Sequence, residues 1–234
     1  MHDTKSPPQF AEGDAAFRAR GDKAQATRAY ELYKKAYTEN PTDAEAGWRY
    51  AMICYFMGIK HTTTDEQRRE IYSAGRDAGL EALKHNDQCA ACYFWTAIDM
   101  ALYGQATGPF KMFFSLGTIK EYLEKGLRID PAYAYGGAYR LLGQIDEALP
   151  GFLGGSVERA ALHYEKAIAT VPDEPMNYLF LAKLLAESKK LPEQALGVAK
   201  RGLGIPAPST DRLESNEALQ DLRELVKKLE APRK

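Results

Sequence analysis

The sequence predicts an all-α protein built as a solenoid of about five helical hairpins. Three observations lead to this fold class. A spacing of small and aromatic residues recurs along the chain, each copy ends in a helix-terminating residue, and each terminator precedes another amphipathic stretch. Small residues on one helical stripe let a neighbouring helix approach closely, and a unit with one apolar face must stack on another unit. A repeated stripe of this kind therefore requires stacked helical hairpins.

The repeated pattern consists of a small residue, an aromatic or aliphatic residue, a second small residue and a terminator. In chain order the copies are Ala29, Tyr33, Ala36 and Pro41; then, more weakly, Gly75, Gly79, Ala82 and Asp87; then Ile119, Leu123, Gly126 and Pro131; and finally Ala160, Tyr164, Ala167 and Pro172. Proline ends a helix because its ring blocks the continuing hydrogen-bond ladder. The spacing resembles the second helix of the tetratricopeptide repeat (TPR).

Amphipathic stretches behind the terminators predict the first helices of the following units. They cover residues 44–58, 89–104, 132–149 and 175–188. A weaker fifth pairing is expected over residues 192–204. The terminators lie farther apart than the roughly 34 residues of a standard TPR. We therefore expect inserted loops between the helices of three units, at residues 58–65, 104–117 and 149–155.

This pattern divides the chain into three segments. Residues 1–11 are expected to be a flexible lead-in, residues 12–208 a TPR-like repeat domain, and residues 209–234 a capping helix and tail. Ser209, Thr210 and Asp211 supply helix-capping side chains before a charged stretch, as a polar cap on a solenoid requires. The N-terminus lacks the apolar segment of a signal peptide, and no apolar run reaches the roughly 20 residues that span a bilayer.

Charge and residue spacing argue against several kinds of chemistry. The 31 basic residues balance 32 acidic ones, which gives no electrostatic case for a nucleic-acid or anionic-membrane partner. The four histidines lie far apart without metal-ligand spacing, and no phosphate-binding or nucleophile motif is found. Cys89 and Cys92 form a C-x-x-C that is open to three interpretations: packing residues, a mutual disulfide, or a disulfide from either to Cys54. We expect no enzyme activity, cofactor or metal.

One region carries a resemblance to a narrower family. It comprises GGAYRLLG at 136–143, LPGFLGGS at 149–156, and HYEKA at 163–167. These segments resemble the T component (TatT) of TPR-associated TRAP transporters. The loop with the signature consists of Pro150, Gly151, Phe152, Gly154 and Gly155. The resemblance implies a periplasmic accessory protein, often trimeric, that binds the transporter's solute-binding P component and has a pore through each protomer.

The predicted concave face of the first helices is apolar. Its candidate ligand or partner residues are Trp48, Met52, Tyr55, Phe94, Ile98, Tyr135, Leu142 and Leu179. Such a groove favours a hydrophobic small molecule or an apolar partner segment, although a tight superhelix would make the same residues core. The apolar cluster at residues 110–114 is expected to fold over such a groove or to form an oligomer contact.

Two functions remain open from the sequence. The first is a non-enzymatic, TatT-like periplasmic component that engages a solute-binding protein and a hydrophobic ligand. The alternative is a general TPR adaptor that binds a peptide segment and has no transport role, with a cytoplasmic location as the alternative to the periplasm.

Overall fold

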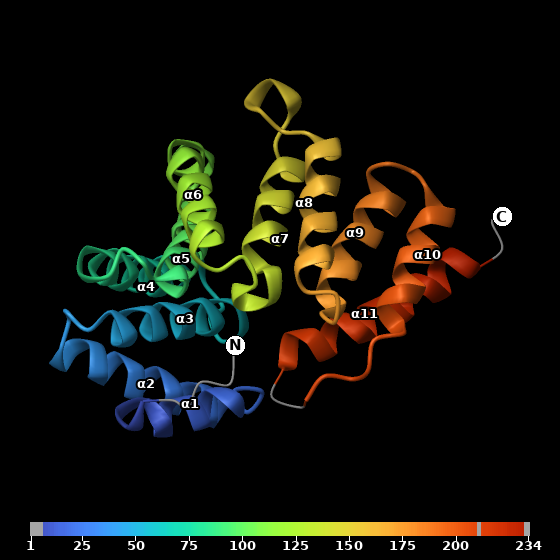
Figure 1. Ribbon diagram of the computed structural model, residues 1–234. Helices are drawn as coiled ribbons and strands as arrows, with labels where there is room; N and C mark the ends of the chain where they lie inside the picture. The colour runs from blue at the N-terminus through green and yellow to red at the C-terminus, as the bar shows by residue number, and fades with distance from the viewer. Residues whose placement is uncertain (1–6, 210–211, 232–234) are drawn as a thin grey trace. The chain divides into compact units, whose positions relative to one another are not determined.

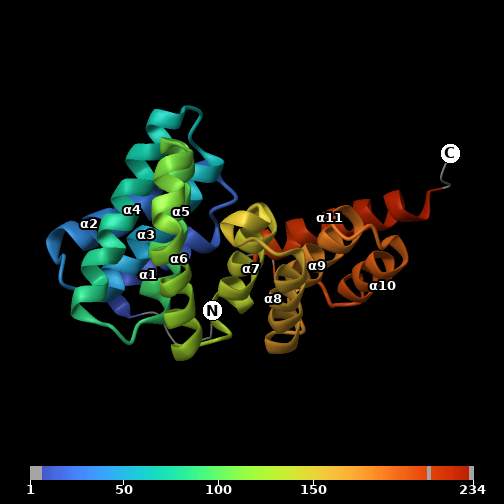
Figure 2. The ribbon, with the colours of Figure 1, turned by 90° about the horizontal axis from the view of Figure 1, so that it is seen from above.

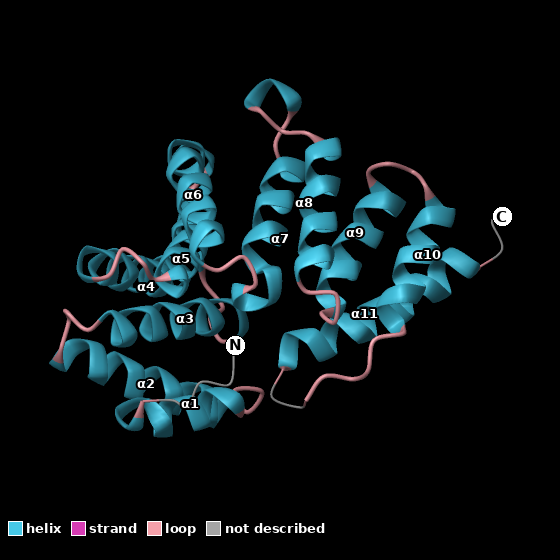
Figure 3. Cartoon of the chain, in the orientation of Figure 1, coloured by secondary structure: helices cyan, strands magenta, loops and turns pink. Residues whose placement is uncertain are grey.

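The computed structural model describes residues 7–209 and 212–231. Within these ranges every regular element is helical and no strand occurs (Figure 3). This confirms the predicted all-α class. None of the described helices is both long enough and apolar enough to cross a membrane.

The described chain forms five helical hairpins followed by one further helix, as predicted (Figure 1). Short 3-10 helices occur at Pro8–Phe10 and Gly151–Leu153. The α-helices are α1 (Ala11–Arg18), α2 (Lys23–Glu39), α3 (Ala44–Lys60), α4 (Asp65–His85), α5 (Ala90–Thr107), α6 (Pro109–Ile129), α7 (Tyr133–Ala148), α8 (Val157–Thr170), α9 (Pro175–Glu187), α10 (Pro192–Leu203) and α11 (Leu213–Glu230). The helices fall into two compact units, Met1–Asp130 and Pro131–Lys234.

Small residues allow the helices of the first unit to approach closely. A Cβ atom on Gly75 of α4 would lie 2.1 Å from the Asp99 carboxylate of α5, and one on Gly79 would lie 2.1 Å from the Thr96 hydroxyl. The α3–α4 and α5–α6 hairpins lie side by side through such contacts (Figure 2). The recurring small residues in the sequence therefore mark the helix contacts, as their spacing predicted.

A buried ion pair joins the first hairpin to α3. Arg49 donates to the Asp14 carboxylate at 3.1 Å, and the Tyr33 hydroxyl donates to the same carboxylate. The Arg49 guanidinium lies 4.4 Å from the Phe10 ring centre and 4.2 Å from that of Trp48. A buried charge is tolerated when it is paired and hydrogen-bonded, so this cluster fixes α1, α2 and α3 in one arrangement.

The second unit contains a turn that the sequence did not predict. Ala134, Tyr135 and Gly136 have φ values of 50°, 56° and 78°, which are left-handed. Arg140 stabilises this turn by donating to the carbonyls of Tyr135 at 2.6 Å and Ala134 at 3.1 Å. The predicted continuous helix over 132–149 is therefore wrong at its start, because a buried guanidinium stabilises another backbone conformation there.

One expected insertion is also not a loop. Residues 104–117 belong almost entirely to helices, since α5 continues to Thr107 and α6 begins at Pro109. Gly108 makes the turn with a φ of 135°, which few other residues adopt. The extra residues lengthen both helices of this hairpin. The other two expected insertions correspond to the connections at 61–64 and 149–156, the second of which is one residue longer than expected.

Asp99 gives a prediction about stability and pH. Its side chain is fully buried, and neither carboxylate oxygen has a hydrogen-bond partner. Burial raises the pKa of Asp99 well above its ordinary value, and nearby Arg76 offsets only part of this. The native state therefore keeps a proton that the unfolded chain loses above about pH 4, so the stability that this proton contributes is lost as pH rises through the native pKa.

Asp99→Asn should weaken this fall in the free energy of unfolding with rising pH. For one group the fall can reach about 1.4 kcal/mol per pH unit. The measurement is urea unfolding from about pH 5 to about pH 8. Asp173→Asn is the control, because Asp173 is an exposed carboxylate in the turn between α8 and α9. An unchanged slope in the Asp99 variant would show that Asp99 is already ionised in the native state.

Candidate functional site

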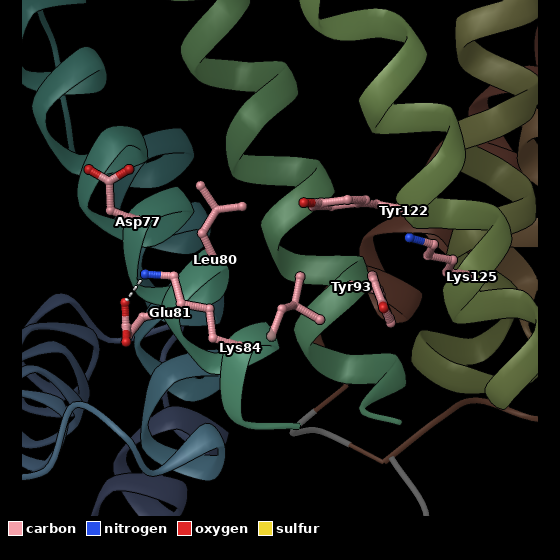
Figure 4. Close-up of a pocket in the computed structure, with 8 residues that line it drawn as sticks. Asp77, Leu80, Glu81, Lys84, Tyr93, Tyr122 and Lys125 are labelled. Atoms are coloured by element: carbon pink, nitrogen blue, oxygen red, sulfur yellow. Dashed lines mark hydrogen bonds and ion pairs between the residues drawn. The ribbon is translucent and has the colours of Figure 1, made fainter. Parts of the chain in front are cut away.

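A groove lies between α4 and α6 and has the first turn of α5 as its floor (Figure 4). Its volume is about 580 Å³. Side chains from all three helices line it: Asp77, Leu80, Glu81, Leu83, Lys84, Tyr93, Tyr122 and Lys125. The whole groove lies within the first compact unit.

Two tyrosines and a lysine form one side of the groove. The rings of Tyr93 and Tyr122 meet edge to face, with centres 5.5 Å apart and planes at 74°. The Lys125 ammonium lies 5.8 Å and 5.9 Å from the two ring centres. Tyrosine rings offer large contact area at low entropic cost and are common at binding surfaces. This side therefore combines an apolar surface with a positive charge.

The α4 side of the groove carries both signs of charge. Glu81 accepts from Lys84 at 2.7 Å and from His85 at 3.1 Å. The hydrogen bond with Lys84 lowers the pKa of Glu81 and raises that of Lys84. Both groups are therefore charged at neutral pH, next to the exposed carboxylate of Asp77 and the apolar Leu80 and Leu83.

This groove was not predicted from the sequence, because all the predicted groove residues came from the first helices of the hairpins. Asp77, Glu81, Tyr122 and Lys125 lie on second helices, from which no groove residue was predicted. A helical-spacing signal was present, since Asp77 and Glu81 are four residues apart and Tyr122 and Lys125 three. Only the fold brings the two pairs to opposite sides of one groove.

The residues predicted to line a concave groove are mostly buried. Trp48, Met52, Phe94, Ile98, Leu142 and Leu179 are at most 7% exposed, and Tyr55 and Tyr135 are half-buried. Tyr55 packs against Trp95, with ring centres 5.5 Å apart. Their use as ligand or partner contacts stays a prediction.

In the second unit, α11 covers part of the predicted face. Leu179 of α9 packs in one cluster with Ala218, Leu219 and Leu222 of α11. The Arg212 guanidinium lies 4.0 Å from the ring centre of Tyr135. The helix predicted as a polar cap therefore also supplies an apolar face that packs on α9.

The predicted signature loop lies on the surface. Pro150, Gly151 and Gly154 are exposed, Phe152 is 87% exposed, and Gly155 is half-buried. Arg159 holds this connection by donating to the buried Asp146 carboxylate at 2.7 Å and 2.8 Å.

Phe110, Phe113 and Phe114 of α6 are also exposed, at 81%, 49% and 79%. This cluster therefore does not close over a groove in the structure.

The cysteines take one of the arrangements left open by the sequence. Cys89 and Cys92 form a disulfide at the start of α5, whereas Cys54 is a buried free thiol. The described part of the chain contains no group of three or more histidine, cysteine, aspartate and glutamate residues arranged to hold a metal ion.

The family follows from comparison with known proteins. A family model described as regulator of microtubule dynamics protein 1-3 matches residues 10–144, more than half of the chain. The chain belongs to this family. A curated relative, regulator of microtubule dynamics protein 1 of Caenorhabditis elegans, is 25% identical over 218 residues, which cover 86% of this chain and 92% of the relative.

A solved structure supports the fold assignment. The crystal structure of a thermophilic TPR protein in Thermus thermophilus superimposes with a TM-score of 0.65 at 19% identity, covering 91% of this chain and 99% of that one. At this level of identity the likeness concerns the fold alone. It confirms the predicted TPR-like solenoid.

The family assignment corrects the resemblance to TatT, which is wrong. The periplasmic location and the TRAP P component depended on that resemblance, and the match to the regulators of microtubule dynamics overturns both. The trimer loses the resemblance that favoured it, and the homo-oligomer stays a prediction. The resemblance misled because helix packing dictates part of the sequence pattern that suggested TatT. A Cβ atom on Gly143, for example, would lie 2.4 Å from the Tyr164 ring. Any closely packed hairpin needs a small residue there.

The attachment of α11 gives a second prediction. Glu174, 1% exposed at the start of α9, accepts from the Ser215 hydroxyl at 2.9 Å, from the Met176 amide at 3.0 Å and from Arg212. Glu174→Ala should lower the free energy of unfolding by about 2–4 kcal/mol, because it removes a helix cap and leaves a buried partner unpaired.

Urea unfolding would measure this loss. The matched control is Asp221→Ala, because the Lys183–Asp221 pair also joins α9 to α11 but is exposed. It should cost less than about 1 kcal/mol. Equal losses in the two variants would contradict a special role for the buried carboxylate.

Proposed function

We propose that this protein is a non-enzymatic adaptor that regulates microtubule dynamics by binding a peptide segment of a protein partner. Membership of the regulator of microtubule dynamics family carries this proposal. TPR-like solenoids present extended surfaces to other proteins, which agrees with an adaptor. The cytoplasm, where microtubules lie, is the location that this function requires.

We place the peptide contact in the groove between α4 and α6. The groove combines two tyrosine rings and two leucines with charges of both signs. A peptide has apolar side chains, charged side chains and backbone amides, so it can use all of these groups together. An entirely apolar ligand would take the Glu81–Lys84 pair and Lys125, which pairs with Glu121 at 2.8 Å, out of water without offering them new polar contacts, which costs free energy. The groove chemistry therefore supports the adaptor alternative over a hydrophobic small molecule.

The test uses an extract of the protein's own cells from which the protein has been depleted. Microtubule growth and shortening rates are followed by fluorescence microscopy after purified wild-type protein or the Tyr122→Ala, Lys125→Glu double variant is added. The wild type should restore the rates of the undepleted extract. The double variant should need at least about ten times more protein, because loss of an aromatic contact at a binding site typically costs about 2 kcal/mol.

Lys166→Glu is the matched control, since Lys166 is an exposed lysine on α8 of the second unit. It should act like the wild type. If the wild type does not restore the rates, the proposed regulation is wrong. If the double variant acts like the wild type, the function stands and the groove is not its site.

A further inference from the structure

We propose that Cys89 and Cys92 form a redox-active pair that exchanges disulfides with small thiols of the glutathione class. Cys89 is the attacking sulfur and Cys92 the resolving sulfur. The two residues are three positions apart and joined in the structure. This inference goes beyond the proposed adaptor function and does not rest on it.

The position of Cys89 suits a reactive sulfur. Cys89 is the N-cap of α5, an 18-residue helix, and its sulfur accepts the backbone N–H of Cys92 at 3.0 Å. Helix N-termini stabilise negative charge through their unpaired amides and the helix dipole. The same amide would stabilise a thiolate on Cys89 after reduction, and the thiolate is the reactive form of cysteine.

The two sulfurs differ in access. Cys89 is partly exposed, whereas Cys92 is 0% exposed and lies against the first turn of α3, 3.9 Å from the Ala44 carbonyl oxygen. An incoming thiol or disulfide can therefore reach Cys89 but not Cys92. This asymmetry assigns the first step of exchange to Cys89 and leaves Cys92 to complete the reaction within the chain.

The fold does not need the bond to remain closed. A disulfide between residues three positions apart closes a short loop, so it removes little conformational freedom from the unfolded chain. The first turn of α5 keeps a capping group in both states, because the Cys89 sulfur can accept the Cys92 amide with or without the bond. Reduction therefore leaves the helix start supported.

The cysteine pair and a small disulfide exchange two electrons in two steps. The Cys89 thiolate attacks one sulfur of a small disulfide, the S–S bond of that disulfide breaks, and one small thiolate leaves. The Cys92 thiolate then attacks the Cys89 sulfur of the mixed disulfide and releases the second small thiolate. The two leaving thiolates take up the two protons lost by the cysteines. The cysteine pair is oxidised by two electrons and the small disulfide is reduced to two thiols.

The first experiment uses the wild-type chain in buffers of reduced and oxidised glutathione at different ratios. After acid quenching and alkylation, mass spectrometry counts the free thiols. We expect Cys89 and Cys92 to gain and lose their labels together within this range of ratios. Cys54 is the internal control: it is 0% exposed, and burial raises the pKa of its thiol well above the usual value. It should stay a thiol and form no mixed disulfide.

Single variants in a Cys54→Ala background separate the two roles. With oxidised glutathione, Cys92→Ser should accumulate one glutathione on Cys89 at least about ten times faster than Cys89→Ser accumulates it on Cys92, because thiolate character and exposure control the rate. Serine at position 89 retains a capping oxygen for α5. Circular dichroism of each variant checks its folding.

Three results would overturn the proposal. The wild-type pair could remain a disulfide at every glutathione ratio until the chain is unfolded, or it could remain two thiols at every ratio. The two serine variants could also form adducts at equal rates. The wild-type titration decides the question even if a variant fails to fold. No partner protein is present in these assays, so their outcome is separate from that of the adaptor proposal.

Discussion

Close approach between neighbouring helices is the constraint on which the other features of this structure depend. At Gly75, Gly79 and Gly143 there is no room for a side chain, because each backbone packs directly against a side chain of the next helix. Interiors at this density tolerate few changes in volume. The contacts bring the first-helix aromatics into the interior of each unit, and they leave the faces of the second helices to meet solvent and partners.

This constraint explains why the fold could be predicted from the sequence and the candidate site could not. The spacing of Ala29, Tyr33 and Ala36 reports helix packing, and it recurs in four of the hairpins, so the repeated hairpins were found. The final helix was predicted separately, from capping residues before a charged stretch. Tyr122 and Lys125 obey no repeat. Their role depends on which side chains α4 places opposite them, and only the assembled fold contains that information.

The errors at residues 104–117 and 134–136 have separate physical causes. Residues 104–117 make this unit longer than a standard TPR, as expected. They extend two helices on either side of Gly108, however, and do not form a loop. At Ala134 the amphipathic pattern favoured a helix, whereas the buried Arg140 side chain holds the backbone in a left-handed turn. Local periodicity does not report on a hydrogen bond that spans six residues.

Family membership is hard to infer from packing residues for a related reason. Gly143 of α7 satisfies a requirement shared by closely packed hairpins of many families, so its agreement with one family carries little information about function. Residues outside the close helix contacts are more informative, because helix packing alone does not account for their identity. Lys125 beside two tyrosine rings and the partly exposed sulfur of Cys89 are of this kind. Arguments about the function of this family are therefore best based on the second-helix surfaces and the start of α5.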